Sequence, residues 1–197
     1  MGDGIVLTHG AGSNAQAPWL IALASALAGA GFTVLRCDLP YRQVRPHGPP
    51  GPADAARDRK GLNHAVGAMR KLVRGRVLLG GHSYGGRQST MLAAGEPDLV
   101  EGLVLLSYPL HPPGKPEQLR TEHLPNLRNR SLFVQGTRDP FASIEEIQQA
   151  LQLIPAETRL LAVEGAGHDL KVKAARNGEA VVGKIVATFQ EFFDQAK

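Results

Sequence analysis

Apolar residues along the chain gather in short runs that are separated by longer segments of mixed character. Each run is five or six residues long, which suits a strand that is buried on both faces of a sheet. Six runs predict strands, at Gly4–Thr8, Phe32–Cys37, Arg76–Gly80, Gly102–Ser107, Ser131–Gln135 and Arg159–Val163.

The segments between these runs place apolar residues three and four positions apart, which predicts amphipathic helices. Residues 62–73 and 144–154 follow this pattern, and Ser143 and Glu146 have the spacing of a capping box at the start of the second helix. A closing helix is predicted from Val182, Ile185, Val186, Phe189 and Phe193. Because strand and helix alternate, we expect an α/β fold with a compact, six-stranded, mostly parallel sheet and helices on both faces.

Length and composition fit one ordinary globular domain over residues 1–197. Hydrophobic residues make up 43% of the chain and charged residues 20%. Residues 17–35 carry no charge, but the break at residues 29–31 favours a helix, a turn and a strand over a membrane span. The single cysteine, Cys37, excludes an internal disulfide, and no signal-peptide pattern opens the chain. We therefore expect a cytoplasmic protein with no membrane partner.

The net charge of +4 comes partly from residues 36–76, which contain ten Arg or Lys but only three Asp. Such a cluster raises the question of a nucleic-acid surface. It has no interleaved aromatic residues, zinc-ligand spacing or recognition helix, so a solvated basic face is the better interpretation and no nucleic-acid partner is expected.

The stretch "VLLGGHSYGGR" carries the strongest chemical signal. In it Gly81-x-Ser83-x-Gly85 follows a predicted strand and precedes a predicted helix over residues 88–94. This is the context of a nucleophile elbow, a tight turn that exposes a serine hydroxyl. Taken alone, the pentapeptide also fits a glycine-rich turn with a capping serine.

A nucleophilic serine needs a histidine to accept its proton and an acid to orient that histidine. Asp139 follows the fifth predicted strand and His168 follows the sixth, in the order Ser, Asp, His that suits this architecture. Asp38, Glu164 and Asp169 are weaker candidates for the acid. The carboxyl ends of parallel strands meet at one edge of a sheet, so we expect Ser83, Asp139 and His168 to converge.

The negative oxygen formed on the attacked carbonyl needs backbone donors. The N–H of Tyr84 is the first, and the loop "THGAGSN" offers Ala11 as the second, with Gly12 as the next choice. Proline-rich segments 40–52 and 109–125 follow strands, and they are candidate pocket walls or, equally, stiff surface connections. Residues 108–130 are too few for a helical cap, so no large lid is expected over a shallow site. Substrate contacts are predicted from Tyr108, Leu110, His111 and Phe141.

The glycines near the start of the chain also permit a different interpretation. Residues 10–15, "GAGSNA", fit a dinucleotide-binding fingerprint, and Asp38 lies where an acid would hold a ribose. That hypothesis leaves Ser83, Asp139 and His168 unexplained, so it ranks below the hydrolase hypothesis.

Five stretches together, "LRCDLPYR", "GGHSYGGRQS", "LLSYPLHPPGKPEQLRTEHL", "VQGTRDPF" and "GAGHDL", resemble the bacterial α/β-hydrolase family related to dienelactone hydrolases and to KANL3/Tex30 proteins. The resemblance implies an α/β-hydrolase fold with Ser83, Asp139 and His168 as the triad. Ser83 stands where dienelactone hydrolases have a cysteine, so their lactone substrate is not implied. Some members of the family belong to larger assemblies, which keeps a non-catalytic interaction module as an alternative.

These observations predict a serine hydrolase that cleaves a small-molecule carboxylic ester or thioester. The chemistry of such a triad requires no cofactor and no metal. The sequence identifies neither the acyl group nor a protein partner.

Overall fold

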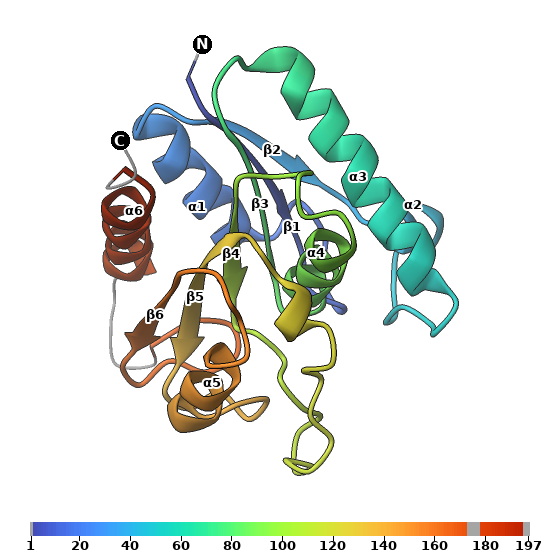
Figure 1. Ribbon diagram of the computed structural model, residues 1–197, viewed down its shortest axis with the longest axis vertical. Helices are drawn as coiled ribbons and strands as arrows, with labels where there is room; N and C mark the ends of the chain where they lie inside the picture. Colours follow the sequence, from blue (N-terminus) through green and yellow to red (C-terminus); the bar gives the residue numbers. More distant parts are fainter. Residues whose placement is uncertain (1, 173–177, 195–197) are drawn as a thin grey trace.

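Six parallel strands form one sheet at the centre of the computed structural model, which describes residues 2–172 and 178–194. Their order across the sheet is β2-β1-β3-β4-β5-β6 (Figure 1). The predicted strands are confirmed to within two residues at each end, and every strand pair is parallel. The strands are β1 Gly4–Thr8, β2 Thr33–Cys37, β3 Val77–His82, β4 Gly102–Leu106, β5 Arg130–Gly136 and β6 Thr158–Val163.

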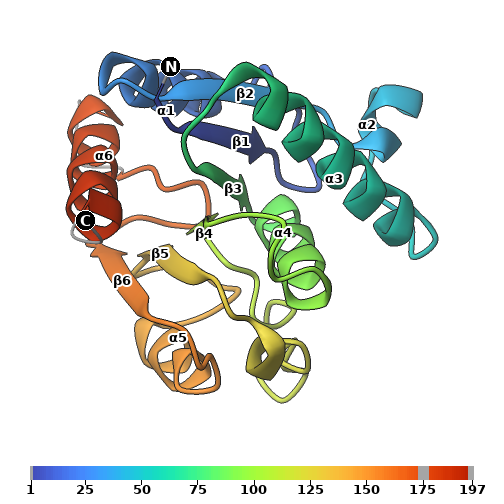
Figure 2. The same ribbon diagram turned by 45° about the horizontal axis from the view of Figure 1, so that its top comes forward.

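Helices cover both faces of this sheet, as predicted. Helices α1 (Pro18–Gly29) and α6 (Gly178–Asp194) lie on one face, and α3 (Asp54–Leu72), α4 (Tyr84–Gly95) and α5 (Ile144–Leu151) lie on the other (Figures 1 and 2). Alternate strand residues supply two apolar cores. In β1, Val6 packs on the α3 side, while Ile5 and Leu7 pack on the α1 side. All three are fully buried, so both faces of the sheet are shielded from water.

The uncharged residues 17–35 divide between α1, a turn at Gly31 with φ 95°, and β2. The break predicted at residues 29–31 is therefore present. Across the described ranges, each helix is too short or too polar to cross a lipid bilayer.

Two helices begin where a loop or turn is expected from the sequence. Within the proline-rich segment 40–52, α2 (Pro40–Val44) has proline at its first position, where a missing N–H costs nothing. Helix α4 starts at Tyr84 rather than at residue 88, because Gly85 and Gly86 belong to its first turn. Both glycines pack against neighbouring backbone, which outweighs their low helix propensity.

The connection from β4 to β5 forms no helical cap. In residues 107–129 the regular structure is the three-residue 3₁₀ helix η1 (Leu124–Asn126). This described connection therefore holds no large lid, as its length predicts. Because all strands are parallel, the loops after β1, β3, β5 and β6 leave the same edge of the sheet.

Candidate active site

The turn between β3 and α4 holds Ser83 in a strained conformation, with φ 51° and ψ −117°. A Cβ atom on Gly81 would lie 2.8 Å from the carbonyl carbon of Gly85. One on Gly85 would lie 2.5 Å from the carbonyl oxygen of His9. Only glycine fits at either position, so the G-x-S-x-G spacing has a direct steric cause.

The structure brings Ser83, His168 and Asp139 together at the carboxyl edge of the sheet. The Ser83 Oγ lies 2.8 Å from His168 Nε2, and His168 Nδ1 lies 2.8 Å from Asp139 Oδ2 and 3.0 Å from Oδ1. A carboxylate only accepts hydrogen bonds, so Nδ1 donates and Nε2 is left to accept from the serine hydroxyl. The imidazole is therefore set in the tautomer that can take the serine proton.

Burial differs sharply between the side chains of Asp139 and His168. The Asp139 side chain is 0% exposed, whereas that of His168 is 23% exposed. The backbone N–H of Phe141 donates to Asp139 Oδ1 at 2.9 Å and fixes the carboxylate. The Phe141 ring lies 4.1 Å from the His168 ring, centroid to centroid, and covers one face of the imidazole. The His168 imidazole thus has a fixed orientation while one part of it stays accessible.

His82, although adjacent to Ser83, takes no part in this hydrogen-bonded chain. Its Nε2 donates to the backbone carbonyl of His168 at 2.7 Å, and its ring packs edge-on against Trp19. Burial lowers the pKa of His82 to about 4, with the neighbouring His168 ring acting in the same direction. A neutral His82 therefore supports the loop that carries His168.

The other acids considered from the sequence lie elsewhere. Asp38 Oδ1 accepts from the backbone N–H of Ala15 at 2.7 Å, and exposed Asp169 pairs with Lys171 at 3.3 Å. Glu164 is also exposed. Neither Asp38 nor Asp169 hydrogen bonds to His168, whose Nδ1 is occupied by Asp139.

Tyr84 and Ala11, the two residues expected to provide oxyanion donors, line the same cavity as Ser83. Tyr84 is the first residue of α4, and first-turn N–H groups have no acceptor within their own helix. Gly12, the second choice, is not among the residues that line this cavity. Ala11 therefore stays ahead of Gly12 as the candidate for the second oxyanion donor.

The loop carrying Ala11 is held by a buried arginine. Arg42 donates from Nη2 to the carbonyl oxygens of Ala11 at 3.0 Å and Gly48 at 2.9 Å. It also donates from Nε to Ser13 at 2.8 Å and from Nη1 to Arg45 at 3.0 Å. One guanidinium therefore joins the loop after β1 to the loop after α2, and both loops border the cavity.

A buried carboxylate links the same loop to the start of α4. Asp58, on α3, accepts from the Tyr41 backbone N–H at 3.0 Å and from the Tyr84 hydroxyl at 2.8 Å. Burial raises the pKa of the Tyr84 hydroxyl, and the hydrogen bond and charge of Asp58 raise it further. The Tyr41 hydroxyl donates to the Ala11 carbonyl at 2.7 Å. Asp58 thus contacts Tyr84 directly and Ala11 through Tyr41, so one carboxylate helps to position both residues expected to supply oxyanion donors.

Of the four substrate contacts expected from the sequence, Phe141 lines the cavity at Ser83 and the other three do not. Tyr108 is buried, and its hydroxyl lies 3.3 Å from both Thr90 Oγ1 and His123 Nε2. Leu110 borders a separate cavity beside α5. His111 Nε2 forms a hydrogen bond with Glu146 Oε2 at 3.2 Å. These three residues anchor the segment after β4 to the body of the protein, so we correct this expectation.

The cavity has a volume of about 500 Å³. Both proline-rich segments reach it, through residues 49–52 and Pro109, in agreement with their expected position. Arg87, Gln88 and Arg120 also line it, and the sequence analysis did not predict them as site residues. Arg87 and Gln88 directly follow the elbow glycines, which is the signal that could have found them.

The dinucleotide fingerprint lacks its structural context. In that motif the glycine turn opens a helix, but here α1 begins at Pro18, after the turns at residues 11–16. The Asp38 carboxylate accepts a hydrogen bond from the backbone N–H of Ala15, which belongs to the fingerprint itself. The glycines serve a loop that passes close to Ser83, since a Cβ on Gly10 would lie 3.4 Å from the Ser83 Cβ.

The sheet is parallel, a tight turn after β3 carries Ser83, and Asp139 and His168 lie at the same edge of the sheet. Together these features define an α/β-hydrolase fold. Comparison with protein families matches residues 2–194 to the alpha/beta hydrolase domain. The chain therefore belongs to the alpha/beta hydrolase family.

Solved structures share the fold at low sequence identity. Est1E from Butyrivibrio proteoclasticus, solved with ferulic acid bound, has a TM-score of 0.75 and 18% identity, covering 97% of this chain and 89% of that chain. Dienelactone hydrolase from Anabaena variabilis has a TM-score of 0.71 and 22% identity, covering 98% and 86%. A monoacylglycerol lipase from Paleococcus ferrophilus has a TM-score of 0.69 and 18% identity, covering 93% and 94%.

Proposed function

We propose that this protein is a serine hydrolase that cleaves a carboxylic ester or thioester of a small molecule through an acyl-enzyme. The observation that carries the proposal is the continuous hydrogen-bonded chain from Ser83 Oγ through His168 to Asp139, with both links at 2.8 Å. A serine that merely caps a helix would not need this partner, and Ser83 makes no side-chain capping bond to α4.

The reaction begins when His168 Nε2 takes the Ser83 proton as Oγ attacks the carbonyl carbon of the substrate. The carbonyl oxygen becomes negative and is held by the N–H groups of Tyr84 and Ala11. His168 then protonates the leaving alcohol or thiol, and the acyl group remains on Ser83. Water, activated by the same imidazole, releases the acid and restores the serine. Asp139 stabilises the imidazolium in both halves of the reaction.

The related structures agree with this class of reaction. They include a dienelactone hydrolase, a monoacylglycerol lipase and Est1E with ferulic acid bound. An ester of a small organic acid is therefore the first substrate class to assay. The proposed chemistry uses side chains and backbone amides of this chain for every proton transfer and for charge stabilisation.

Labelling with a fluorophosphonate probe tests the proposal directly. The wild-type protein should react at one site, and Ser83→Ala should abolish labelling. Ser25→Ala is a matched control because Ser25 is exposed on α1, on the far face of the sheet. A folded wild-type protein that stays unlabelled and does not hydrolyse aryl esters would overturn the proposal and favour a non-catalytic interaction module.

A further inference from the structure

Two arginines line the cavity that contains Ser83. Arg87 lies on α4, and its backbone N–H donates to the Ser83 carbonyl at 3.0 Å. Four residues of helix correspond to about 6 Å along the axis, so Arg87 stands one turn beyond the reacting serine. Arg120 comes from the segment between β4 and β5, and its Nη1 donates to the carbonyl oxygen of Pro109 at 3.2 Å. Two distant parts of the chain thus bring positive charge to one cavity.

No acidic side chain of the described residues forms an ion pair with Arg87 or Arg120. The nearby carboxylates have other partners: Asp58 accepts from Tyr41 and Tyr84, and Asp139 accepts from His168. Glu122 is exposed and forms no ion pair with either arginine in the described structure. The positive charge in the cavity is therefore not neutralised by a protein carboxylate in contact with it.

Hydrogen-bond donors in the same wall also lack acceptors. Within the described structure, Arg87 Nε and Gln88 Nε2 are buried and have no hydrogen-bond partner. Gln88 is fully buried, and its Oε1 already accepts from Arg59 at 2.9 Å, so the unpaired amide nitrogen is fixed in place. A buried donor without an acceptor costs free energy, on the order of 1–3 kcal/mol. An acceptor from outside the chain would remove that cost.

The two guanidinium groups also act on each other. Burial lowers the pKa of Arg120, and the positive charge of Arg87 lowers it further. Burial and then Arg87 likewise lower the pKa of His123 to about 4, so this neighbour is neutral near pH 7. Guanidinium groups stay protonated in proteins, so the repulsion between Arg87 and Arg120 persists until an anion enters.

We propose that the ester cleaved at Ser83 carries an anionic group, a carboxylate or a phosphate, that binds between Arg87 and Arg120 with Gln88 as an additional donor. This inference rests on the hydrolase function proposed above and narrows its substrate class. Guanidinium forks match the paired oxygens of both anions. Because Arg87 lies one helical turn from Ser83, a spacer of a few carbon atoms separates the anionic group from the carbonyl that is attacked.

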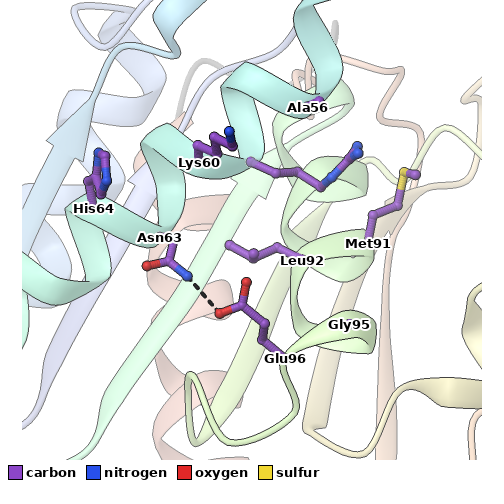
Figure 3. Close-up of a pocket in the computed structure, with 9 residues that line it drawn as sticks. Ala56, Lys60, Asn63, His64, Met91, Leu92, Gly95 and Glu96 are labelled. Atoms are coloured by element: carbon purple, nitrogen blue, oxygen red, sulfur yellow. Dashed lines mark hydrogen bonds between the residues drawn. The ribbon is translucent and has the colours of Figure 1, made fainter.

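A second basic cavity does not offer the same site. It lies between α3 and α4 and has a volume of about 390 Å³ (Figure 3). Lys60 and His64 line it, but Glu96 lies in the same wall and accepts from Asn63 at 2.7 Å. Its lining shares no residue with the cavity at Ser83. An anion bound in that second cavity would therefore contact none of the residues that line the cavity at Ser83.

Paired substrates of equal length test the proposal. Mono-4-nitrophenyl glutarate carries a terminal carboxylate, and 4-nitrophenyl pentanoate is its neutral counterpart. The wild-type ratio of kcat/KM for the charged over the neutral ester should be about tenfold or more. Arg87→Gln and Arg120→Gln should each lower this ratio by roughly tenfold, toward 1, which is the loss expected for one charged hydrogen bond. Arg120→Lys should keep part of the preference.

Lys71→Gln is the control for a change in net charge. Lys71 is exposed near the far end of α3, about 24 Å along the helix from Ala55 at the cavity. Its kcat/KM for both esters should match the wild type. If Arg87→Gln does not fold, Arg120→Gln still tests the proposal, because Arg120 lies in a loop and its replacement does not disturb helix α4. Competition by succinate and by inorganic phosphate against the neutral ester then identifies the preferred anion, since the tighter inhibitor indicates the chemistry of the substrate.

The proposal is overturned if the wild type does not prefer the charged ester, or if the arginine variants lower both rates equally. In either case the neutral ester is still hydrolysed and Ser83 is still labelled. Loss of those two activities in the wild type would instead refute the hydrolase function itself.

Discussion

Replacing Arg42 with lysine should loosen the loop that carries Ala11 while preserving the charge. The arginine is buried and donates four hydrogen bonds to main-chain carbonyl oxygens. A lysine ammonium is a compact group that cannot span all four acceptors, and we expect it to keep two. The variant therefore separates the geometry of the guanidinium from its charge.

The size of the effect follows from the bonds that are lost. A hydrogen bond to a charged group contributes about 1.5–3 kcal/mol, so two lost bonds correspond to roughly 3–6 kcal/mol. Water reaches the freed carbonyl oxygens as the loop relaxes, and neighbouring interactions are not additive. We expect the free energy of unfolding of Arg42→Lys to fall by about 2–4 kcal/mol.

Catalysis should suffer mainly in kcat. Removing one oxyanion donor costs about 10²- to 10³-fold, and a displaced Ala11 amide should cost roughly 10- to 100-fold. Because the oxyanion exists only in the transition state, KM should change little. Urea unfolding followed by circular dichroism gives the stability, and hydrolysis of 4-nitrophenyl pentanoate gives kcat and KM.

Arg70→Lys is the matched control. Arg70 donates to the Leu99 carbonyl and to Glu101 at the exposed far end of α3, so its loss of stability should stay below about 1 kcal/mol and kcat should be unchanged. A folded Arg42→Lys protein with wild-type kcat would show that the position of the Ala11 amide does not depend on Arg42, which would refute this prediction.

Three further changes have defined outcomes. Gly85→Ala places a methyl group 2.5 Å from the His9 carbonyl oxygen, so urea unfolding should show a loss of about 1–3 kcal/mol and hydrolysis should fall as well. Asp139→Asn should lower kcat by about 10³- to 10⁴-fold in steady-state assays, because an amide that donates to His168 Nδ1 holds the wrong tautomer. For His82, burial lowers the folded-state pKa to about 4 against 6.5 in the unfolded chain. As pH falls from 6.5 to 4 the unfolded chain binds the proton first, so unfolding free energy should decrease by up to about 3 kcal/mol, and His82→Gln should remove that part of the slope in urea titrations.

Each of these has a control or a contradicting result. Gly95→Ala changes the same helix where a Cβ meets nothing within 4 Å, so its stability should not fall. Equal losses for Gly85→Ala and Gly95→Ala would contradict the steric argument. An Asp139→Asn enzyme with near-normal kcat would show that His168 is oriented by another group. An unchanged pH slope in His82→Gln would mean that His82 does not contribute to the pH dependence of stability.

The strands and the three converging side chains could be predicted because they depend on local pattern. A run such as 77–80 is apolar since helices cover both faces of the sheet, and parallel strands bring residues that follow them to one edge. Ser83, Asp139 and His168 each come just after a strand. Their meeting therefore depends on topology more than on the detailed path of any loop.

The cavity wall could not be predicted in the same way. Ser107 adopts φ 50° directly after β4 and redirects the chain, so Tyr108 is buried with its hydroxyl beside Thr90. Nothing in the order of residues 107–111 indicates that turn. Arg87 and Arg120 lie 33 positions apart, and only the folded path of the β4–β5 connection brings both to one cavity.

The anchoring of that connection has a kinetic consequence. His123 Nε2 lies 2.8 Å from Thr90 Oγ1 on α4, and the Arg120 backbone N–H donates to the Leu110 carbonyl at 2.8 Å. The segment after β4 is thus a fixed wall rather than a hinged cover. Among the described residues, this connection has no hinged part that must move before a ligand enters. We therefore expect ligand binding to be governed by diffusion and orientation, and progress curves of the proposed hydrolysis to start without a lag.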